Sequence, residues 1–195
     1  EVAQLLEGAV RTPGFDGAHC EIAFFGGSFT GLQLSLQEEF YRAASVYQKE
    51  IDGIRLSTRP DYINPEVLSL ARRWGVTLIE LGAQSSSDAV LKCNRRLHTF
   101  SDTCAAVTQI RKSGIKVGLQ MMTGMYGADT RVDLKTAEDF IELAPDCVRI
   151  YPTVVLKETI LDRLYRQGRY IPQSLEQAVE TAKEILLLFR KQNIP

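Results

Sequence analysis

The chain has 195 residues, 45% of them hydrophobic and 24% charged, a composition typical of a globular protein with a substantial buried core. Its 23 basic and 24 acidic residues give a formal net charge of −1, which excludes a global field that would draw the whole surface onto nucleic acid or a membrane. No apolar run is long enough to span a bilayer, and the four cysteines have neither metal-ligand nor disulfide-framework spacing. Because Glu1 is not an initiator Met and no leader follows it, we expect a soluble, cytoplasmic piece of a longer protein.

Along the chain, short apolar runs alternate with longer segments of helical period. A first helix is expected at Glu1–Val10, with no strand ahead of it. The five expected strands are Glu21–Phe25, Ile54–Ser57, Thr77–Leu81, Lys116–Met121 and Cys147–Tyr151. The helices expected between and after them are Leu36–Lys49, Pro65–Trp74, Ser101–Ser113, Val132–Leu143 and Ser174–Gln192.

Particular residues mark the helix boundaries. Asn64 followed by Pro65 is a helix-start signal, and so is Ser101. Gly75 and Gly114 lie where C-terminal caps belong, and each leads directly into an expected strand.

The expected strands are near-continuous hydrophobic sequence, as in parallel sheets covered by crossover helices, so the sequence predicts an α/β fold. Five βα units after an unpaired helix indicate a partial (β/α) TIM-like barrel of parallel strands with its first strand missing. A doubly wound open sheet is the competing arrangement. Without a linker or a low-complexity segment, residues 1–195 are expected to form a single domain, truncated at its N-terminus.

Ligand-binding residues are expected where the strands end, because βα loops and free helix N–H groups converge at the carboxyl edge of a parallel sheet. After the first strand, Gly26 and Gly27 would let the backbone approach a ligand, although a tight turn needs the same residues. The second strand ends near Ser57 and Arg59. The guanidinium suits either a carboxylate ligand or a loop-shaping ion pair with Asp61.

The later strands carry further polar groups. The third buries Glu80 in an apolar run, so this carboxylate needs a partner, and it ends on Gln84 and Ser85, which can hydrogen-bond a polar ligand. The basic run Lys92–Arg96 is either a solvated face or an anion clamp. Tyr151, on the fifth strand, could stack on a base or simply pack.

Groups able to perform catalysis are not evident. There are no paired catalytic carboxylates, no cluster around His19 or His98, no nucleophile elbow and no phosphate-binding glycine motif. We therefore assign no catalytic residue, expect no metal site in this chain, and infer that a reactive cofactor supplies the chemistry.

Taken together and in order, the strand ends resemble the radical S-adenosylmethionine superfamily, most closely its Elongator catalytic-subunit branch and the related bacterial radical proteins. Each motif is weak alone, but five in register cover nearly the whole chain. They are FGGSFTGL (Phe25–Leu32), STRPDYI (Ser57–Ile63), ELGAQS (Glu80–Ser85), NRRLHT (Asn94–Thr99), and IYPTVV with LYRQGRY (Ile150–Tyr170).

In that superfamily, a partial barrel holds a 4Fe-4S cluster on a CxxxCxxC loop after its first strand, and the cluster binds the methionine part of S-adenosylmethionine. The resemblance implies that Gly26, Gly27 and Ser28 meet the methionine amino group. It implies polar contacts to the carboxylate and ribose from Ser57, Arg59 and Arg95. The remaining residues implied to line the cavity, up to the ribose and adenine, are Gln84, Ser85, Gln120 and Tyr151.

The chain departs from the family pattern in three ways. None of its cysteines has the cluster spacing, so the cluster ligands would belong to the longer protein, and this piece alone is expected to be inactive. Ser57 replaces the Glu that is usual in the Elongator-type motif. The chain ends at Pro195 without an acetyltransferase domain, so the acetyl-CoA half of the Elongator reaction is not expected to be encoded in these residues.

The resemblance implies an enzyme that generates a 5′-deoxyadenosyl radical, with flavodoxin or ferredoxin as electron donor, a tRNA base as the expected substrate and no membrane partner. RNA phosphate could meet the run Lys92–Arg96 or Arg163, Arg166 and Arg169. One alternative is an oxygen-independent coproporphyrinogen oxidase-like enzyme, which should need basic residues inside the barrel rather than outside it. The other is a non-catalytic, ligand-binding α/β domain.

Overall fold

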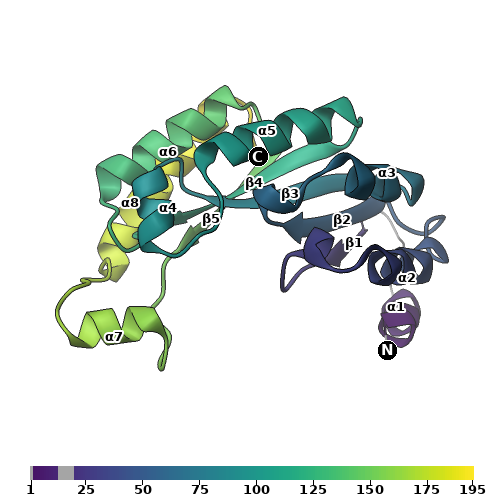
Figure 1. Ribbon diagram of the computed structural model, residues 1–195, viewed down its shortest axis with the longest axis horizontal. Helices are drawn as coiled ribbons and strands as arrows, with labels where there is room; N and C mark the ends of the chain where they lie inside the picture. Colours follow the sequence, from purple (N-terminus) through teal and green to yellow (C-terminus); the bar gives the residue numbers. More distant parts are fainter. Residues whose placement is uncertain (1, 13–19) are drawn as a thin grey trace. The chain divides into compact units, whose positions relative to one another are not determined.

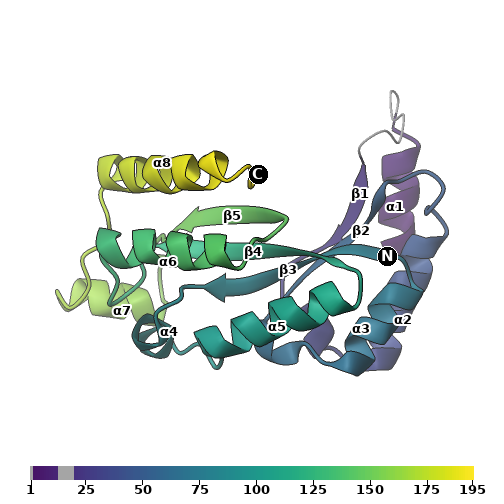
Figure 2. The same cartoon turned by 90° about the horizontal axis from the view of Figure 1, so that it is seen from above.

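The computed structural model describes residues 2–12 and 20–195 (Figures 1 and 2). Two 3-10 turns, η1 (Phe29–Gly31) and η2 (Pro60–Tyr62), follow the first two strands. The strands are β1 (Glu21–Phe24), β2 (Gly53–Thr58), β3 (Val76–Gln84), β4 (Lys116–Thr123) and β5 (Cys147–Pro152). The α-helices are α1 (Val2–Val10), α2 (Leu34–Ser45), α3 (Pro65–Arg73), α4 (Asp88–Cys93), α5 (Phe100–Lys112), α6 (Thr130–Glu142), α7 (Ile160–Arg166) and α8 (Leu175–Lys191).

The strands form a five-stranded sheet in the order β1-β2-β3-β4-β5. The pairs β1–β2, β2–β3 and β4–β5 are parallel. A strand order that follows the chain is that of a (β/α) barrel, whereas a doubly wound sheet reverses its order at a switch point. The expected α/β fold with a partial barrel of parallel strands is therefore confirmed. All five expected strands are present, and β3 continues to Gln84, beyond its expected end at Leu81.

The helix boundaries confirm most of the expected caps. The Asn64 side chain accepts hydrogen bonds from the backbone N–H groups of residues 66 and 67, both at 3.0 Å. Gly75 and Gly114 end their helices at φ values of +75° and +77°. The start signal at Ser101 is wrong, because α5 begins at Phe100. Thr99 and Asp102 close this end by exchanging side-chain-to-backbone hydrogen bonds.

The chain divides into two compact units. Unit 1 comprises residues 1–81 and 105–117, and unit 2 comprises residues 82–104 and 118–195. Each has fully buried apolar side chains: Tyr41, Ile54, Leu56 and Ile79 in unit 1, and Leu91, Met121, Phe140 and Ile185 in unit 2. The expectation that residues 1–195 form a single domain stays a prediction. Within the described ranges, none of the helices has both the length and the hydropathy needed to cross a membrane.

Candidate functional site

Alternate residues of β2 and β3 form a polar face in unit 1. Ser57 lies opposite Glu80 in the sheet register, and Arg55 shares their face because successive strand residues point to opposite sides. Glu80 is only 1% exposed and accepts a 3.1 Å hydrogen bond from Arg55 Nη1. Arg55 Nη2 also pairs with Glu21 of β1. The expected need of Glu80 for a partner is therefore confirmed, and an ion chain crosses three strands.

The glycine loop after β1 leaves open space beside its backbone. Gly26 has a φ of +105°, a conformation that favours glycine. No atom lies within 4 Å of the place where a Cβ would stand at Gly26 or Gly27. Gly27 and Ser28 line a pocket of about 330 Å³ together with Phe24, Phe29 and Phe40. The loop therefore leaves room for a ligand beside its main chain, and contacts from residues 26–28 to a cofactor stay predictions.

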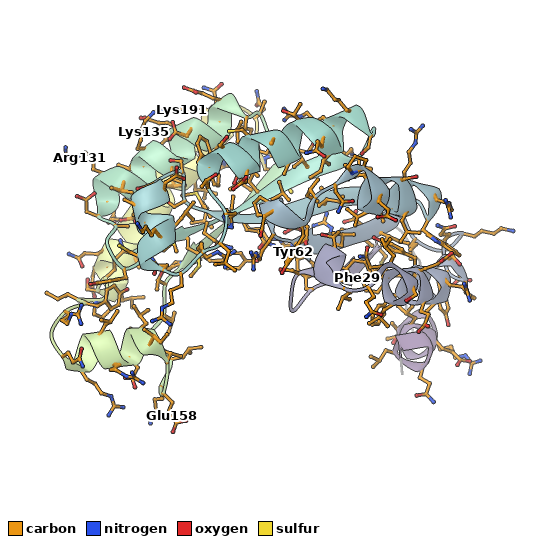
Figure 3. All side chains as sticks on the ribbon, viewed as in Figure 1. Phe29, Tyr62, Arg131, Lys135, Glu158 and Lys191 are labelled. Carbon is orange, nitrogen blue, oxygen red and sulfur yellow. The ribbon has the colours of Figure 1, made fainter. Side chains whose placement is uncertain are left out.

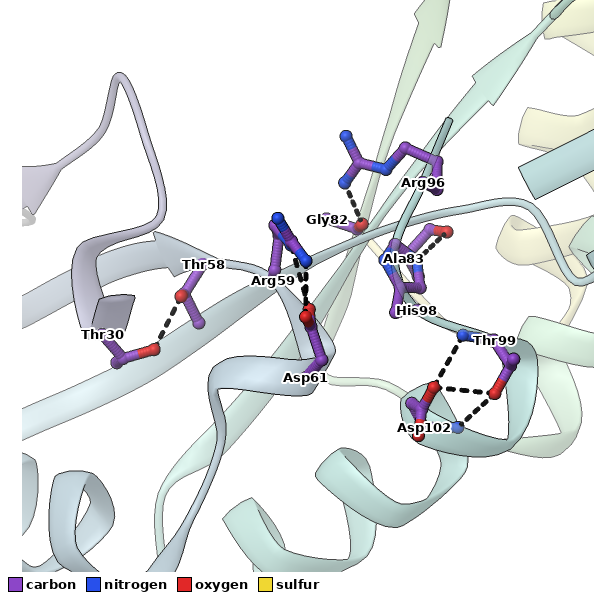
Figure 4. Close-up of polar contacts among 10 residues, drawn as sticks. All are labelled: Thr30, Thr58, Arg59, Asp61, Gly82, Ala83, Arg96, His98, Thr99 and Asp102. Carbon is purple, nitrogen blue, oxygen red and sulfur yellow. Dashed lines mark hydrogen bonds and ion pairs between the residues drawn. The ribbon is translucent and has the colours of Figure 1, made fainter. Parts of the chain in front are cut away.

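A buried polar network holds the segment that directly follows this loop. The hydroxyl groups of Thr30 and Thr58 lie 2.7 Å apart, and both residues are buried (Figure 4). Gln37 of α2 is 0% exposed and donates from Nε2 to the carbonyl oxygens of Thr30 at 3.2 Å and Leu32 at 2.8 Å. None of these three polar side chains was expected to take part. The sequence offered one signal for this network: Gln37 lies one helical turn before Tyr41, so both side chains are on the same face of the helix.

Replacing Thr58 by Val is expected to lower the free energy of unfolding by about 1–2 kcal/mol, because the buried Thr30 hydroxyl loses its partner. Thr58→Ser keeps the hydroxyl and is the matched control. Urea unfolding followed by circular dichroism measures both variants. Equal stabilities for Val and Ser would contradict a role of this hydrogen bond in anchoring the loop.

Arg59 forms the ion pair that was one of its two expected roles. Its Nε donates to Asp61 Oδ1 at 2.9 Å (Figure 4). Its guanidinium carbon also lies 4.7 Å from the centre of the Tyr62 ring. The hydrogen bond to Asp61 raises the pKa of Arg59. Contacts from Ser57 and Arg59 to a cofactor stay predictions.

Gln84 combines two unfavourable features at the end of β3. Its φ of +66° is uncommon for any residue but glycine, and its side chain is only 9% exposed. Its Oε1 is buried and has no hydrogen-bond partner in the structure. Such strain and an unused acceptor are typical of a functional site, where a ligand completes the hydrogen bonding.

Ser85, the neighbour of Gln84, is satisfied within the fold. Its hydroxyl lies 3.1 Å from Thr136 Oγ1 of α6 and accepts a 3.2 Å hydrogen bond from the Ser87 backbone. It is 3% exposed. These bonds indicate a structural role, and a contact to a cofactor stays a prediction.

The basic run after α4 separates into two kinds of residue. Arg95, the expected site residue, is exposed at a φ of +54° and lines a small pocket with Cys93 and Tyr126. Arg96 is half-buried, and its Nη2 donates to the carbonyl oxygen of Gly82 at 3.0 Å, two residues before Gln84 (Figure 4). Arg96 was not expected, yet it is the arginine held against the polar end of β3.

The last two expected residues lie on one face of unit 2. Gln120 of β4 is 8% exposed and lies opposite Arg149 of β5, while Tyr151 lies opposite Met122. The alternation of strand residues therefore places Gln120, Arg149 and Tyr151 on the same face. Arg149 was not expected. The expected residues thus fall in two groups, Gly26, Gly27, Ser28, Ser57 and Arg59 in unit 1 and Gln84, Ser85, Arg95, Gln120 and Tyr151 in unit 2.

The turn after β4 is held by a clamp on Gly124. Its N–H donates to Asp133 Oδ2 at 2.9 Å, and its carbonyl oxygen accepts a 2.7 Å hydrogen bond from the Tyr170 hydroxyl. Burial raises the pKa of Asp133 to about 6, although the Gly124 N–H acts in the opposite direction. Asp133 is therefore a buried carboxyl group that titrates between the usual values for Asp and His.

The free energy of unfolding should fall as the pH rises from about 4 to 6, because the folded chain keeps the Asp133 proton after the unfolded chain has released it. We expect Asp133 to contribute about 2 kcal/mol to this fall after allowance for solvent screening. Asp133→Asn should remove that contribution, and Glu138→Gln, an exposed change on the same helix, should not. Urea unfolding at closely spaced pH values measures the slope, and an unchanged slope in Asp133→Asn would rule out this assignment.

Metal-ligating side chains do not gather in the described ranges, where no three His, Cys, Asp or Glu groups come together. None of the four cysteines, Cys20, Cys93, Cys104 and Cys147, forms a disulfide in the described part of the chain. His98 is 2% exposed, with its Nε2 3.1 Å from the carbonyl oxygen of Ala83, and His19 lies outside the described residues. These residues do not fit an iron–sulfur cluster. The open Gly26 backbone in unit 1 and, separately, the unused Gln84 acceptor in unit 2 each suit a polar organic ligand.

Comparisons of the sequence with known proteins identify its family and its relatives. The family model of the radical SAM superfamily matches residues 3–144, and that of the radical SAM C-terminal domain matches residues 145–195. The tRNA uridine(34) acetyltransferase of Methanocaldococcus jannaschii is 31% identical over 156 residues, covering 78% of this chain and 29% of that protein. Human Elongator complex protein 3 is 34% identical over 139 residues, covering 70% of this chain and 25% of that protein. The chain therefore spans less than a third of either relative.

Solved structures show the same fold. A Methanocaldococcus infernus Elp3 with an N-terminal deletion superposes with a TM-score of 0.84 at 25% identity, covering 94% of this chain and 48% of that one. The Escherichia coli coproporphyrinogen III oxidase HemN, a radical SAM enzyme, superposes with a TM-score of 0.69 at 17% identity. This alignment covers 98% of this chain and 46% of HemN, and at such low identity it shows the fold alone.

Proposed function

The chain belongs to the radical SAM superfamily, and we propose that it is the cofactor-binding core of a longer enzyme that modifies a tRNA base. S-adenosylmethionine, bound beside a 4Fe-4S cluster, would supply a 5′-deoxyadenosyl radical. Because no cluster ligand set is found in the described residues, the ligands would come from another part of that enzyme, and the 195-residue chain alone would be inactive. The electron donor, flavodoxin or ferredoxin, and the cytoplasmic location stay predictions.

The observation that carries the proposal is the state of Gln84. A buried, unpaired acceptor at a positive φ is costly for the fold, and a bound polar ligand would offset that cost. Gln84 also lies within ELGAQS, one of the motifs that carry the resemblance. We propose that its amide group accepts a hydrogen bond from a hydroxyl group of the cofactor.

The other proposed contacts follow the strand ends. In unit 1, the main chain of residues 26–28 would bind the amino acid part of the cofactor. Ser57 and Arg59, in the next motif along the chain, would add polar contacts to it. In unit 2, Gln120 and Tyr151 would contact the nucleoside part. Arg96 is a better candidate than Arg95 for binding the cofactor carboxylate, because it is held against β3 while Arg95 is exposed.

The pairing of Arg55 on β2 favours a tRNA substrate over a porphyrin, although β5 places a second cation, Arg149, on the face of Tyr151. A coproporphyrinogen oxidase-like enzyme should present cations on the polar face of the sheet to bind propionate groups. The cation that β2 places there, Arg55, is already paired with two carboxylates, Glu80 and Glu21. Similarity to proteins named as tRNA uridine(34) acetyltransferases also supports action on tRNA.

The decisive measurement is the formation of 5′-deoxyadenosine. The longer protein would be reconstituted with iron and sulfide without oxygen, reduced with dithionite and given S-adenosylmethionine, and the products separated by chromatography. We expect 5′-deoxyadenosine from the longer protein and none from the 195-residue chain treated in the same way. A full cluster without 5′-deoxyadenosine would favour the non-catalytic, ligand-binding alternative.

A further inference from the structure

A groove in unit 2 is lined by none of the residues assigned above to the cofactor. Its volume is about 510 Å³, within the range of roughly 300–1,000 Å³ that is usual for small-molecule sites. It runs along the segment that follows β5 and the first turns of α8. Thr153 and Tyr165 are among the residues that line it.

The groove contains a polar group that the fold leaves unused. Thr153 donates its backbone N–H to the carbonyl oxygen of Thr123 at 2.9 Å, but its buried Oγ1 has no hydrogen-bond partner. A buried hydroxyl without a partner costs stability unless a ligand or water completes it. A ligand of this groove should therefore be mainly apolar, with a hydrogen-bonding edge.

An aromatic ring stands at the same groove. Tyr165 belongs to α7 and remains 50% exposed although it lines the groove. In Figure 1, α7 stands apart from the rest of unit 2 at the end of two extended connections. A half-exposed tyrosine beside an apolar groove offers a stacking surface for a flat heterocycle.

Some of the exposed cations of unit 2 are paired with carboxylates and others are not. Lys135 of α6 pairs with Asp139, and Lys183 of α8 pairs with Glu180. By contrast, the exposed Lys157, Arg163 and Arg169 form no ion pair within the described part of the chain. Arg163 and Arg169 are near neighbours of Tyr165 in the sequence, and Lys157 closely follows Val155, so the three cations are close along the chain to residues of the groove. Such cations suit the phosphates on either side of a base.

We propose that this groove binds an unpaired nucleobase of RNA, stacked on Tyr165 and hydrogen-bonded at its edge by Thr153 Oγ1. Lys157, Arg163 and Arg169 meet the flanking phosphates. Arg166, which the sequence placed among the phosphate candidates, takes no part because Asp162 neutralises it. This inference rests on the proposed action on RNA, since an apolar groove without those cations would fit a peptide equally well.

The test uses the 195-residue chain and a labelled RNA hairpin with a seven-base loop, with a fully paired duplex of similar length as comparison. Fluorescence anisotropy at several salt concentrations measures the dissociation constant of each. We expect tighter binding of the hairpin, and weakening by about 5- to 100-fold in Tyr165→Ala, which removes one stacked base. Thr153→Val should weaken the hairpin by about 5- to 10-fold through the lost hydrogen bond.

The cation arm of the test compares two double variants of equal charge. Arg163→Gln with Arg169→Gln should lower the slope of log affinity against log salt by about 1.4, which corresponds to two phosphate contacts on a single strand. Arg131→Gln with Lys191→Gln, on α6 and α8, is the control and should leave the slope unchanged (Figure 3). Thermal unfolding checks that every variant is folded.

Three results would overturn the inference. The first is hairpin binding that is unchanged both in Tyr165→Ala and in the double variant of Arg163 and Arg169. The second is absence of RNA binding even at about 50 mM salt. The third is a concentration-dependent dimer that Tyr165→Ala abolishes. None of them touches the radical chemistry, which 5′-deoxyadenosine formation tests on the longer protein. Conversely, hairpin binding through Tyr165 would stand even if that protein released no 5′-deoxyadenosine.

Discussion

Replacing Arg55 by Leu is expected to lower the free energy of unfolding by about 3–5 kcal/mol, because the carboxylate of Glu80 then stays buried without the guanidinium that neutralises it. The attraction between the two charges does not itself supply this energy. Most of the loss is the cost of keeping a single charge in a site with 1% exposure. Urea unfolding of the 195-residue chain measures it.

Two controls separate the buried charge from lost packing. The double variant Arg55→Leu with Glu80→Leu removes both charges and should recover most of the stability. Arg166→Leu breaks the Arg166–Asp162 pair, whose side chains are 68% and 13% exposed, and should cost about 1 kcal/mol or less. If the double variant were as unstable as Arg55→Leu, the loss would come from the packing of the arginine stem.

The strands could be predicted because each has its own apolar run, but their ends depend on the surrounding fold. β3 continues through Gly82 and Ala83 to Gln84, where no β-branched residue signals a strand. α7 could not be predicted, because it has seven residues and buries only Asp162, so no apolar face reveals it. The end of β3 is buried but carries no strand-forming residues, and α7 is short and mostly exposed, so tertiary contacts rather than local preference determine both.

The site was predictable only as far as single motifs reach. Gly26 and Gln84 follow from their places in FGGSFTGL and ELGAQS. Arg95 is exposed at a φ of +54°, while Arg96 donates to the Gly82 carbonyl oxygen, and the motif alone does not distinguish the two arginines. Which of them contacts a cofactor stays a prediction. The partner of Glu80 lies 25 residues away in sequence, and only the parallel register of β2 and β3 identifies it.

Gln84→Leu should change stability and cofactor binding in opposite directions. Removing the unpaired Oε1 from its buried place should raise the free energy of unfolding by about 1–2 kcal/mol, since the fold no longer leaves that acceptor unsatisfied. The same change should weaken S-adenosylmethionine binding by about 10- to 100-fold, because the proposed hydrogen bond to a cofactor hydroxyl group is lost. Equilibrium dialysis with labelled cofactor, on the reconstituted longer protein and on this chain, measures the affinity.

Gln109→Leu makes the same chemical change on α5 and should alter neither quantity by more than the error of the measurement. Gln84→Leu removes the acceptor but keeps the positive φ, whereas Gln84→Gly removes the acceptor and relieves the strain of that φ. Comparing the two variants separates the two unfavourable features, and both should lose cofactor binding to the same extent. A residue kept only for the fold would lose stability when replaced. A gain in stability together with a loss of affinity is the result expected of a residue whose unfavourable conformation serves a ligand. If Gln84→Leu loses stability and binds the cofactor unchanged, Gln84 is a structural residue and the site must be sought among the other strand ends.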